Sequence, residues 1–338
     1  MGMVDKRRVL VDPYPRRMEE IFSPADLVRL HDTVEVVWGH DQQMAGEAAE
    51  RALREAIAVV CAGWPYGGAL GEARQLQAII DVGGSFPSTL DYELCFTQRI
   101  RVLTCAPAFA PQVAEMALGL ALAASRDIVA GDRAMRAGVE GWGHAGNVGT
   151  FLLYGKQIGF IGFGNLAQAL RSLLAPFECP IAAYDPWLSA GYLGSAGVKP
   201  LALELLLETS QVIFVLASPT TENKALLSRS LLERIQPGAV LVLISRAHVV
   251  DFEALTELVL AGRFKAAIDV FPGEPVAPDH PIRHAPGAVL SAHRAGSVRE
   301  GLWQIGTMVV DDLEAIVRGL PPRRLQVATP ELALRYAR

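Results

Sequence analysis

Three segments in the second half of the chain carry side chains suited to acid–base chemistry beside an anion. Arg246 follows one β-branched run, Asp269 and Glu274 follow the next, and His293 follows a third. A histidine can deliver a proton near neutral pH, and a carboxylate partner stabilises its charged form. The planar guanidinium of Arg246 suits a carboxylate and a carbonyl oxygen. These residues predict reduction of a 2-keto acid, with His293 as the proton donor and Glu274 as its partner.

A glycine-rich turn upstream, Gly162-Phe163-Gly164-Asn165-Leu166-Ala167, ends an apolar run and opens a helical pattern. Gly162 permits a tight turn, Gly164 lets the backbone approach a pyrophosphate, and Ala167 is small enough for the helix to pack on a sheet. The phosphate would lie at the helix N-terminus. Asp185 ends the next run at about the 20-residue spacing of a ribose ligand, and its carboxylate would repel a 2′-phosphate. We therefore expect NAD rather than NADP, and Asp269 could hold the nicotinamide carboxamide.

The elements that position these residues alternate between strand and helix. In this half of the chain the predicted strands span residues 157–161, 180–184, 212–216, 239–244, 266–270 and 288–291. The predicted helices between them span residues 166–174, 201–208, 230–235 and 252–261. This alternation is typical of a doubly wound nucleotide-binding fold, in which the carboxyl ends of the strands line the ligand crevice. We therefore expect Arg246, Glu274 and His293 to converge at one edge of a sheet.

The first third of the chain alternates in the same way. Its predicted strands span residues 8–11, 34–37, 57–61, 77–81 and 101–104, with a surface helix over 44–56. A long apolar helix is predicted over 112–130, and the glycine-rich stretch Gly138–Gly149 is interpreted as the crossing between domains. A last amphipathic helix over 298–318 ends at Gly319-Leu320-Pro321-Pro322. The fold class is therefore α/β, with two doubly wound parallel-sheet domains.

Composition limits the class of protein. A length of 338 residues predicts two domains, and a net charge of −5 gives no indication of a nucleic-acid partner. No secretory signal or membrane span of about 20 apolar residues is evident, so we expect a soluble, cytoplasmic protein without a membrane partner. The four cysteines form no CxxC pair. His280 and His284 lack a third ligand nearby, so no metal site is expected.

Taken together, these motifs resemble the D-isomer-specific 2-hydroxyacid dehydrogenase family over nearly the whole chain. The matching segments are Gly162–Ala167, Asp185, Ser218-Pro219, Arg246, Asp269–Pro275, His293–Gly296, Val113-Ala114-Glu115 and Gly83-Gly84-Ser85. The resemblance implies Arg246, Glu274 and His293 as the catalytic set. It also implies that the backbone of Gly83, Gly84 and Ser85 holds the substrate carboxylate together with Arg246. The residues expected to contact NAD are Gly162, Gly164, Asn165, Leu166, Asp185, Ser218, Pro219, Ser245 and Asp269.

The resemblance further implies a domain arrangement and an oligomeric state. A flavodoxin-like substrate-binding domain would consist of residues 1–112 plus 296–338. A Rossmann NAD-binding domain of residues 113–295 would be inserted between these two parts. The family usually forms homodimers, and a small 2-keto or 2-hydroxy acid would be the substrate.

Several positions depart from the family pattern. Leu243 stands in place of an asparagine, Ala247 and Ser85 in place of glycines, and Phe109 where an asparagine is common. Arg294, directly after His293, replaces an apolar or neutral residue. These departures predict a divergent substrate pocket. Arg294 could serve an acidic or phosphorylated substrate, or be an ordinary solvated arginine.

Two other functions remain open. A dinucleotide-sensing regulator or corepressor would bind NAD(H) on the same scaffold with little turnover. A dehydrogenase of formate or phosphite would also use a dinucleotide, but Glu274 argues against formate, for which a glutamine is expected. Among keto acids, the sequence does not choose between glyoxylate, hydroxypyruvate, phosphohydroxypyruvate and a bulkier substrate.

Overall fold

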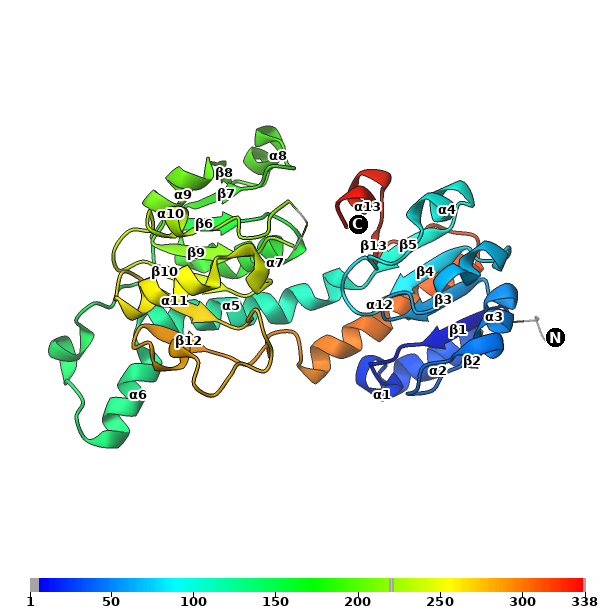
Figure 1. The fold of residues 1–338 in the computed structure, drawn as a ribbon, viewed down its shortest axis with the longest axis horizontal. Coiled ribbons are helices and arrows are strands. Elements are labelled where there is room, and N and C mark those ends of the chain that lie inside the picture. The colour runs from blue at the N-terminus through cyan, green and yellow to red at the C-terminus, as the bar shows by residue number, and fades with distance from the viewer. Residues whose placement is uncertain (1–5, 219, 221, 337–338) are drawn as a thin grey trace. The chain divides into compact units, whose positions relative to one another are not determined.

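Two separate sheets organise the chain, and each has its own helices and core (Figure 1). The computed structural model describes residues 6–218, 220 and 222–336. Unit 1 joins the chain up to Phe109 with the chain from Ser297 onward, and unit 2 spans Ala110–Gly296. The stretch Gly138–Gly149 lies inside unit 2, so its interpretation as a crossing between domains is wrong. The elements on both sides of it belong to unit 2, and the chain passes between the units after Phe109 and after Gly296.

Unit 1 is a three-layered α/β unit. Its sheet has the order β13-β5-β4-β3-β1-β2, and only β13 is antiparallel to its neighbour. The strands are β1 (Arg8–Asp12), β2 (Glu35–Trp38), β3 (Ala58–Cys61), β4 (Ala78–Asp81), β5 (Arg101–Thr104) and β13 (Gln326–Val327). All five strands predicted in the first third of the chain are confirmed. Because β13 comes from the C-terminal segment, both parts of the chain build this sheet.

Side chains alternate between the two faces of this sheet, as the pleat of a strand requires. Val9 and Val11 enter one core, and Leu10 enters the other. The first core is covered by α1 (Met18–Ile21), α2 (Pro24–Thr33) and α12 (Arg299–Val317). The second is covered by α3 (Gly46–Glu55), α4 (Tyr92–Thr97), α13 (Pro330–Tyr336) and the 3₁₀ helix η1 (Gly67–Glu72). Both faces are buried, which explains the near-continuous apolar runs in the strands.

Unit 2 has an all-parallel sheet of order β12-β11-β10-β9-β6-β7-β8. The strands are β6 (Ile158–Ile161), β7 (Ile181–Tyr184), β8 (Lys199–Pro200), β9 (Val212–Val215), β10 (Val240–Leu243), β11 (Lys265–Ile268) and β12 (Ala288–Leu290). The predicted doubly wound fold is confirmed. The strand order reverses at β6, which lies between β7 and β9, and ligands of such sheets bind at the carboxyl ends beside this reversal.

Helices cover both faces of the unit 2 sheet (Figure 1). One face carries α5 (Ala110–Ser125) and α7 (Asn165–Leu174), and the other carries α9 (Leu203–Thr209), α10 (Arg229–Leu232) and α11 (Phe252–Leu260). The remaining helices are α6 (Ile128–Ala137), α8 (Ala190–Ser195) and the 3₁₀ helices η2 (Ala106–Phe109), η3 (Gly143–Asn147), η4 (Ala175–Phe177), η5 (Ala247–Val249) and η6 (Pro281–His284). The predicted long helix over 112–130 is two helices, because Asp127 adopts a left-handed φ of +51° between them.

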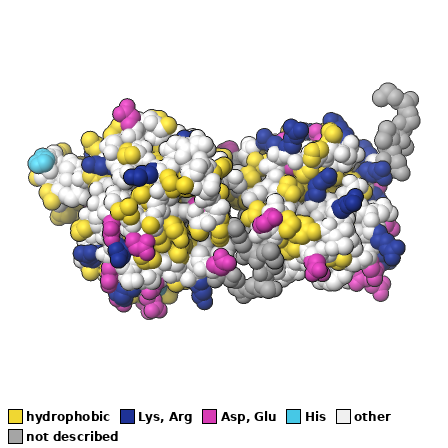
Figure 2. Space-filling model, turned by 90° about the horizontal axis from the view of Figure 1, so that it is seen from above, with side chains coloured by type: hydrophobic (Ala, Val, Ile, Leu, Met, Phe, Trp, Pro, Cys, Tyr) yellow, Lys and Arg dark blue, Asp and Glu magenta, His cyan; other side chains and the backbone are white. Residues whose placement is uncertain are grey.

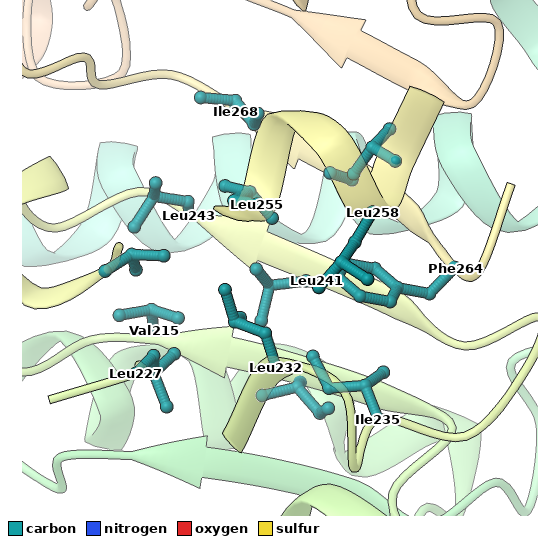
Figure 3. Packing of buried hydrophobic residues seen from close by; sticks show 14 of the residues in the cluster. Val215, Leu227, Leu232, Ile235, Leu241, Leu243, Leu255, Leu258, Phe264 and Ile268 are labelled. Carbon is teal, nitrogen blue, oxygen red and sulfur yellow. The ribbon is translucent and has the colours of Figure 1, made fainter. Parts of the chain in front are cut away.

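The core beneath α10 and α11 fixes the strand that leads to Arg246 (Figure 3). Leu241 and Leu243 of β10 pack in one cluster with Leu232 of α10 and Leu255 of α11. Leu243 is fully buried, and full burial of a leucine side chain stabilises a fold by about 1.5–3 kcal/mol. Leu243, which stands where the family pattern has asparagine, therefore stabilises the core by packing.

The segment from Ala106 to Ser125, which includes α5, is long and apolar enough by length and composition to cross a membrane. Half of it is buried, and Ala114, Ala117 and Ala121 are fully buried in the core of unit 2. Its apolar character is therefore accounted for by packing against the sheet.

Candidate active site

The glycine turn lies at the carboxyl end of β6, where the strand order reverses. Gly162 has a left-handed φ of +90°, and a Cβ on it would lie 2.7 Å from the Cα of Ala217. Only glycine fits there without displacing the backbone that follows β9. Helix α7 begins after Gly164, without a side-chain cap among the described residues. A Cβ on Gly164 would meet open space, so the approach to this helix N-terminus is clear.

Asp185 lies directly beside this turn. Its Oδ2 accepts a hydrogen bond from Phe163 N at 2.9 Å, and its Oδ1 accepts one from Trp187 N at 2.9 Å. An ionised carboxylate has about four acceptor sites, so each oxygen keeps capacity for a ribose hydroxyl. The spacing in the sequence predicted that Asp185 acts together with the glycine turn, and the hydrogen bond from Phe163 N shows that the two are in direct contact.

The chemistry of these residues fits a dinucleotide. Two hydroxyl oxygens at the same edge of the sheet, Ser245 Oγ after β10 and Ser291 Oγ after β12, are buried without a hydrogen-bond partner among the described residues. Buried polar atoms usually have partners, so such atoms indicate a group still to be bound. Ser245 was predicted from the sequence as a cofactor contact, but Ser291 was not; the only signal for Ser291 is its place two residues before His293.

The segment after β9 is held by hydrogen bonds of polar side chains that were not predicted from the sequence. Asn223 Nδ2 donates to the carbonyl oxygen of Ser218 at 2.8 Å, and its Oδ1 accepts from Thr220 N at 2.9 Å. His248 Nε2 lies 3.1 Å from the same Oδ1. Burial, together with the nearby cations Arg246 and Lys224, lowers the pKa of His248. Ser218 is thereby tied to the residues after β10; Pro219, its predicted neighbour in the site, lies outside the described residues.

His293 and Glu274 form the predicted pair. His293 Nδ1 lies 2.7 Å from Glu274 Oε2, and the other carboxylate oxygen accepts from Phe271 N at 2.9 Å. Burial raises the pKa of Glu274, but the hydrogen bonds from His293 and Phe271 outweigh it, and the pKa is lowered overall. Glu274 is therefore an anion near neutral pH. Because Nδ1 is engaged, Nε2 is the ring nitrogen left for a substrate.

The backbone at His293 is strained and is held by a buried acid. His293 has a φ of +50°, a conformation that costs a non-glycine residue about 1–3 kcal/mol. The carboxylate of Asp269, which is fully buried, accepts from Arg294 N at 3.0 Å and Ala295 N at 3.2 Å. The Asp269 carbonyl oxygen also accepts from His293 N at 2.8 Å. Asp269 therefore anchors the histidine turn, while its predicted contact with a carboxamide stays a prediction.

Arg246 lies at the same edge, directly after β10. It is exposed, and its Nη1 donates to the carbonyl oxygen of Ser245 at 2.8 Å. Its charge contributes to lowering the pKa of Glu274, as expected for a cation close to the histidine–glutamate pair. Because β10, β11 and β12 are neighbours in the sheet, the three predicted catalytic side chains lie together. Their proximity follows from three consecutive strands ending at one edge.

The predicted substrate loop lies in unit 1, after β4. Gly83 N, Gly84 N and Ser85 N all donate to Asp81 Oδ1, at 3.0, 2.9 and 3.2 Å, and Gly63 N donates to Oδ2 at 2.8 Å. Asp81 is 2% exposed. The backbone donors of this loop therefore already hold a carboxylate that belongs to the protein.

Comparison with known proteins identifies relatives of this chain. Residues 118–295 match the family model "D-isomer specific 2-hydroxyacid dehydrogenase, NAD binding domain". The D-3-phosphoglycerate dehydrogenase of Archaeoglobus fulgidus is 34% identical over 229 residues, which are 67% of this chain and 43% of that protein. The hydroxypyruvate reductase of Thermotoga maritima is 30% identical over 72% of this chain and 78% of its own length.

The chain spans about half the length of the phosphoglycerate dehydrogenases it matches, 43% in Archaeoglobus fulgidus and 56% in Mycobacterium tuberculosis. Among solved structures, a phosphoglycerate oxidoreductase from Rhizobium etli is similar with a TM-score of 0.86 and 37% identity. That similarity covers 96% of this chain and 99% of the other. The likeness therefore extends over both units.

Proposed function

This chain belongs to the D-isomer-specific 2-hydroxyacid dehydrogenase family, and on that premise we propose that it interconverts a small 2-keto acid and its D-2-hydroxy acid. The contact between His293 and Glu274, at 2.7 Å beside Arg246, is the observation that carries this proposal. A neutral partner would hold the ring, but an anionic one also stabilises the imidazolium that must exist before proton transfer. The bound cofactor would supply the hydride as NADH in the reduction and accept it as NAD⁺ in the oxidation.

In this proposal each side chain has a separate task. Arg246 binds the substrate carboxylate and polarises the keto oxygen through its planar donors. His293 gives the proton on Nε2 to the keto oxygen during reduction and takes it back from the hydroxyl during oxidation. Glu274 keeps the ring in one orientation through Nδ1, and Asp269 keeps the backbone of His293 in place. Since the orientation of the donor is fixed before the reaction, less ordering is needed at the transition state.

We assign NAD binding to residues 113–295 and substrate binding to residues 1–112 plus 296–338. Gly162, Gly164, Asn165 and Leu166 would hold the pyrophosphate, and Asp185 the ribose; Ser218, Pro219, Ser245 and Asp269 would surround the nicotinamide end. The carboxylate of Asp185 favours NAD because it would repel a 2′-phosphate. Comparing the Kd of NADH and NADPH tests this assignment, and a wild type that prefers NADPH would refute it.

A homodimer is part of the proposal. Helix α6 and the chain that follows it carry large apolar side chains that are more than half exposed, namely Ile128, Met135, Val139, Trp142, Val148 and Leu152. Figure 1 shows α6 at one end of unit 2, and Figure 2 shows hydrophobic side chains on the surface of that unit among charged ones. An exposed apolar cluster of this kind is typical of a protein interface. Sedimentation of wild type and Trp142→Asp should give a dimer and a weakened dimer, and a monomeric wild type would refute the proposal.

We also propose a cytoplasmic location. Cys61, Cys95 and Cys105 are free and buried, and burial raises the pKa of the Cys61 thiol well above its ordinary value. Thiols in this state are compatible with a reducing compartment. Fractionation of cells that produce the protein tests the location.

A panel of 2-keto acids assayed with NADH tests the proposed activity. Glyoxylate, hydroxypyruvate, phosphohydroxypyruvate and a branched keto acid cover the sizes and charges left open by the sequence. Oxidation of NADH with at least one of them is expected. A protein that binds NADH but reduces none of them would instead support the regulatory function.

A further inference from the structure

Arg16 lies at the carboxyl-terminal edge of the unit 1 sheet, in the segment that follows β1. Its Nε donates to the carbonyl oxygen of Val82 at 3.0 Å, and its Nη1 donates to Glu20 Oε1 at 2.6 Å. Val82 directly follows β4 and precedes the loop Gly83–Ser85. Arg16 is therefore fastened to that loop, and its side chain is 23% exposed.

The guanidinium of Arg16 also lies on an aromatic ring. Its Cζ is 5.5 Å from the centroid of Phe109, within the range of about 6 Å for a cation–π contact. The ring packs against Gly84, where a Cβ would lie 2.7 Å from Phe109 Cε2 and where φ is +92°. Gly84, Phe109 and Arg16 thus form one packed stack. A guanidinium fixed in this way loses little freedom when it binds an anion.

The loop itself offers an anion few donors. As described above, the N–H groups of residues 83–85 all point to Asp81 Oδ1. Arg16 Nη2, in contrast, has no hydrogen-bond partner among the described residues. Ligands of doubly wound sheets bind at the carboxyl ends of the strands, and Arg16 supplies a charged donor there.

We propose that Arg16 binds the carboxylate of the 2-keto acid in unit 1, in place of the backbone donors that Asp81 occupies. The proposal rests on the proposed function, because it assigns a contact to that reaction's substrate. It makes Arg16 a specificity-determining residue that sets KM for keto acids. A keto acid in which an amide or ester replaces the carboxylate should therefore be a poor substrate.

The experiment compares Arg16→Met with wild type, using glyoxylate, whose only charged group is its carboxylate. Methionine keeps an unbranched apolar side chain against Phe109 and removes the charge and the donors. Loss of a charge-assisted hydrogen bond predicts an increase in KM of about 10- to 100-fold, with kcat within about threefold of wild type. Arg17→Met is the matched control, because Arg17 is exposed and forms no ion pair among the described residues; its KM should equal that of wild type.

A second variant separates binding from a structural role. Glu20→Gln removes the carboxylate that forms an ion pair with the Arg16 guanidinium. If Arg16 binds substrate, KM should stay at or fall below the wild-type value; if the ion pair only supports the fold, KM should rise as in Arg16→Met. A KM for Arg16→Met within twofold of wild type, or equal effects of Arg16→Met and Arg17→Met, would also overturn the proposal.

Calorimetry of oxamate binding to the enzyme–NADH complex provides a readout without turnover. Oxamate carries a carboxylate beside a carbonyl group, and its Kd should rise about as much as KM in Arg16→Met. If wild type reduces no keto acid, the proposed function fails, but the oxamate comparison still tests Arg16. Equal oxamate affinity in wild type and Arg16→Met, or a wild type that binds no oxamate, would overturn the assignment of Arg16.

Discussion

Replacing Glu274 by glutamine isolates the charge of the histidine's partner from its position. The bond from His293 Nδ1 to Glu274 Oε2 is 2.7 Å long, a length typical of a charge-assisted hydrogen bond. Such bonds contribute about 1.5–3 kcal/mol, compared with about 0.5–1.5 kcal/mol for neutral ones. The side chains of His293 and Glu274 are 43% and 36% exposed, and solvent screens their charges. We therefore expect the charged bond to be more stabilising than a neutral one by about 1 kcal/mol.

A loss of about 1 kcal/mol in the transition state corresponds to a fall in kcat/KM of about five- to tenfold for Glu274→Gln. Glu274→Ala loses the whole bond and should fall about 10- to 50-fold. Asp279→Asn is the matched control, since Asp279 is an exposed acid in the same loop. The assay is steady-state reduction of the best keto acid at neutral pH, with the Kd of NADH measured separately.

A kcat/KM for Glu274→Gln within twofold of wild type, together with severe impairment of Glu274→Ala, would refute a role for the charge of Glu274. The partner would then act through shape alone, and its anionic charge would contribute nothing to proton transfer. A loss that appears as weaker NADH binding at unchanged kcat would also refute it.

Four further outcomes are expected. Asp269→Ala should lower the unfolding free energy by about 2–4 kcal/mol, because the buried N–H of Ala295 and the partly buried N–H of Arg294 lose their acceptor; denaturant unfolding measures it, and a loss under 1 kcal/mol contradicts the anchoring role of Asp269. Gly162→Ala should weaken NADH binding at least about tenfold, since its Cβ would meet Ala217 at 2.7 Å; unchanged fluorescence titration would contradict this. Asp185→Ala should shift the ratio of NADH to NADPH affinity toward NADPH, and an unchanged ratio would dismiss it as the ribose ligand. The lowered pKa of Glu274 means that its pair with His293 stabilises the fold fully above Glu274's ordinary pKa of 4.5. That contribution, about 0.5 kcal/mol, should disappear as the pH falls through the lowered pKa, when wild type is compared with Glu274→Gln.

The fold and the contact between His293 and Glu274 could be predicted from the sequence because they follow local rules. Strands of buried parallel sheets are short apolar runs, so β6 and β10 could be recognised within one or two residues of their ends. Residues after consecutive strands of such a sheet must meet at one edge. That rule alone predicts the meeting of Glu274 and His293.

Contacts between residues distant in sequence were less accessible. From the sequence, Asp81 could be recognised only as the end of a strand. Its hydrogen bonds to the backbone N–H groups from Gly83 to Ser85 depend on how the chain turns back after that strand. The bond between Asn223 and His248 joins two loops that follow different strands. Asp127 interrupts a continuous apolar pattern, because hydrophobic periodicity reports burial and not a single left-handed residue.

Single-turnover oxidation of NADH by wild type and His293→Ala tests whether His293 supplies the proton to the keto acid. Wild type should oxidise bound NADH when a 2-keto acid is added, and His293→Ala should be slower by about 10²–10⁴-fold. The Kd of NADH should be unchanged between the two proteins. Near-normal hydride transfer by His293→Ala would contradict the account, because another group would then supply the proton.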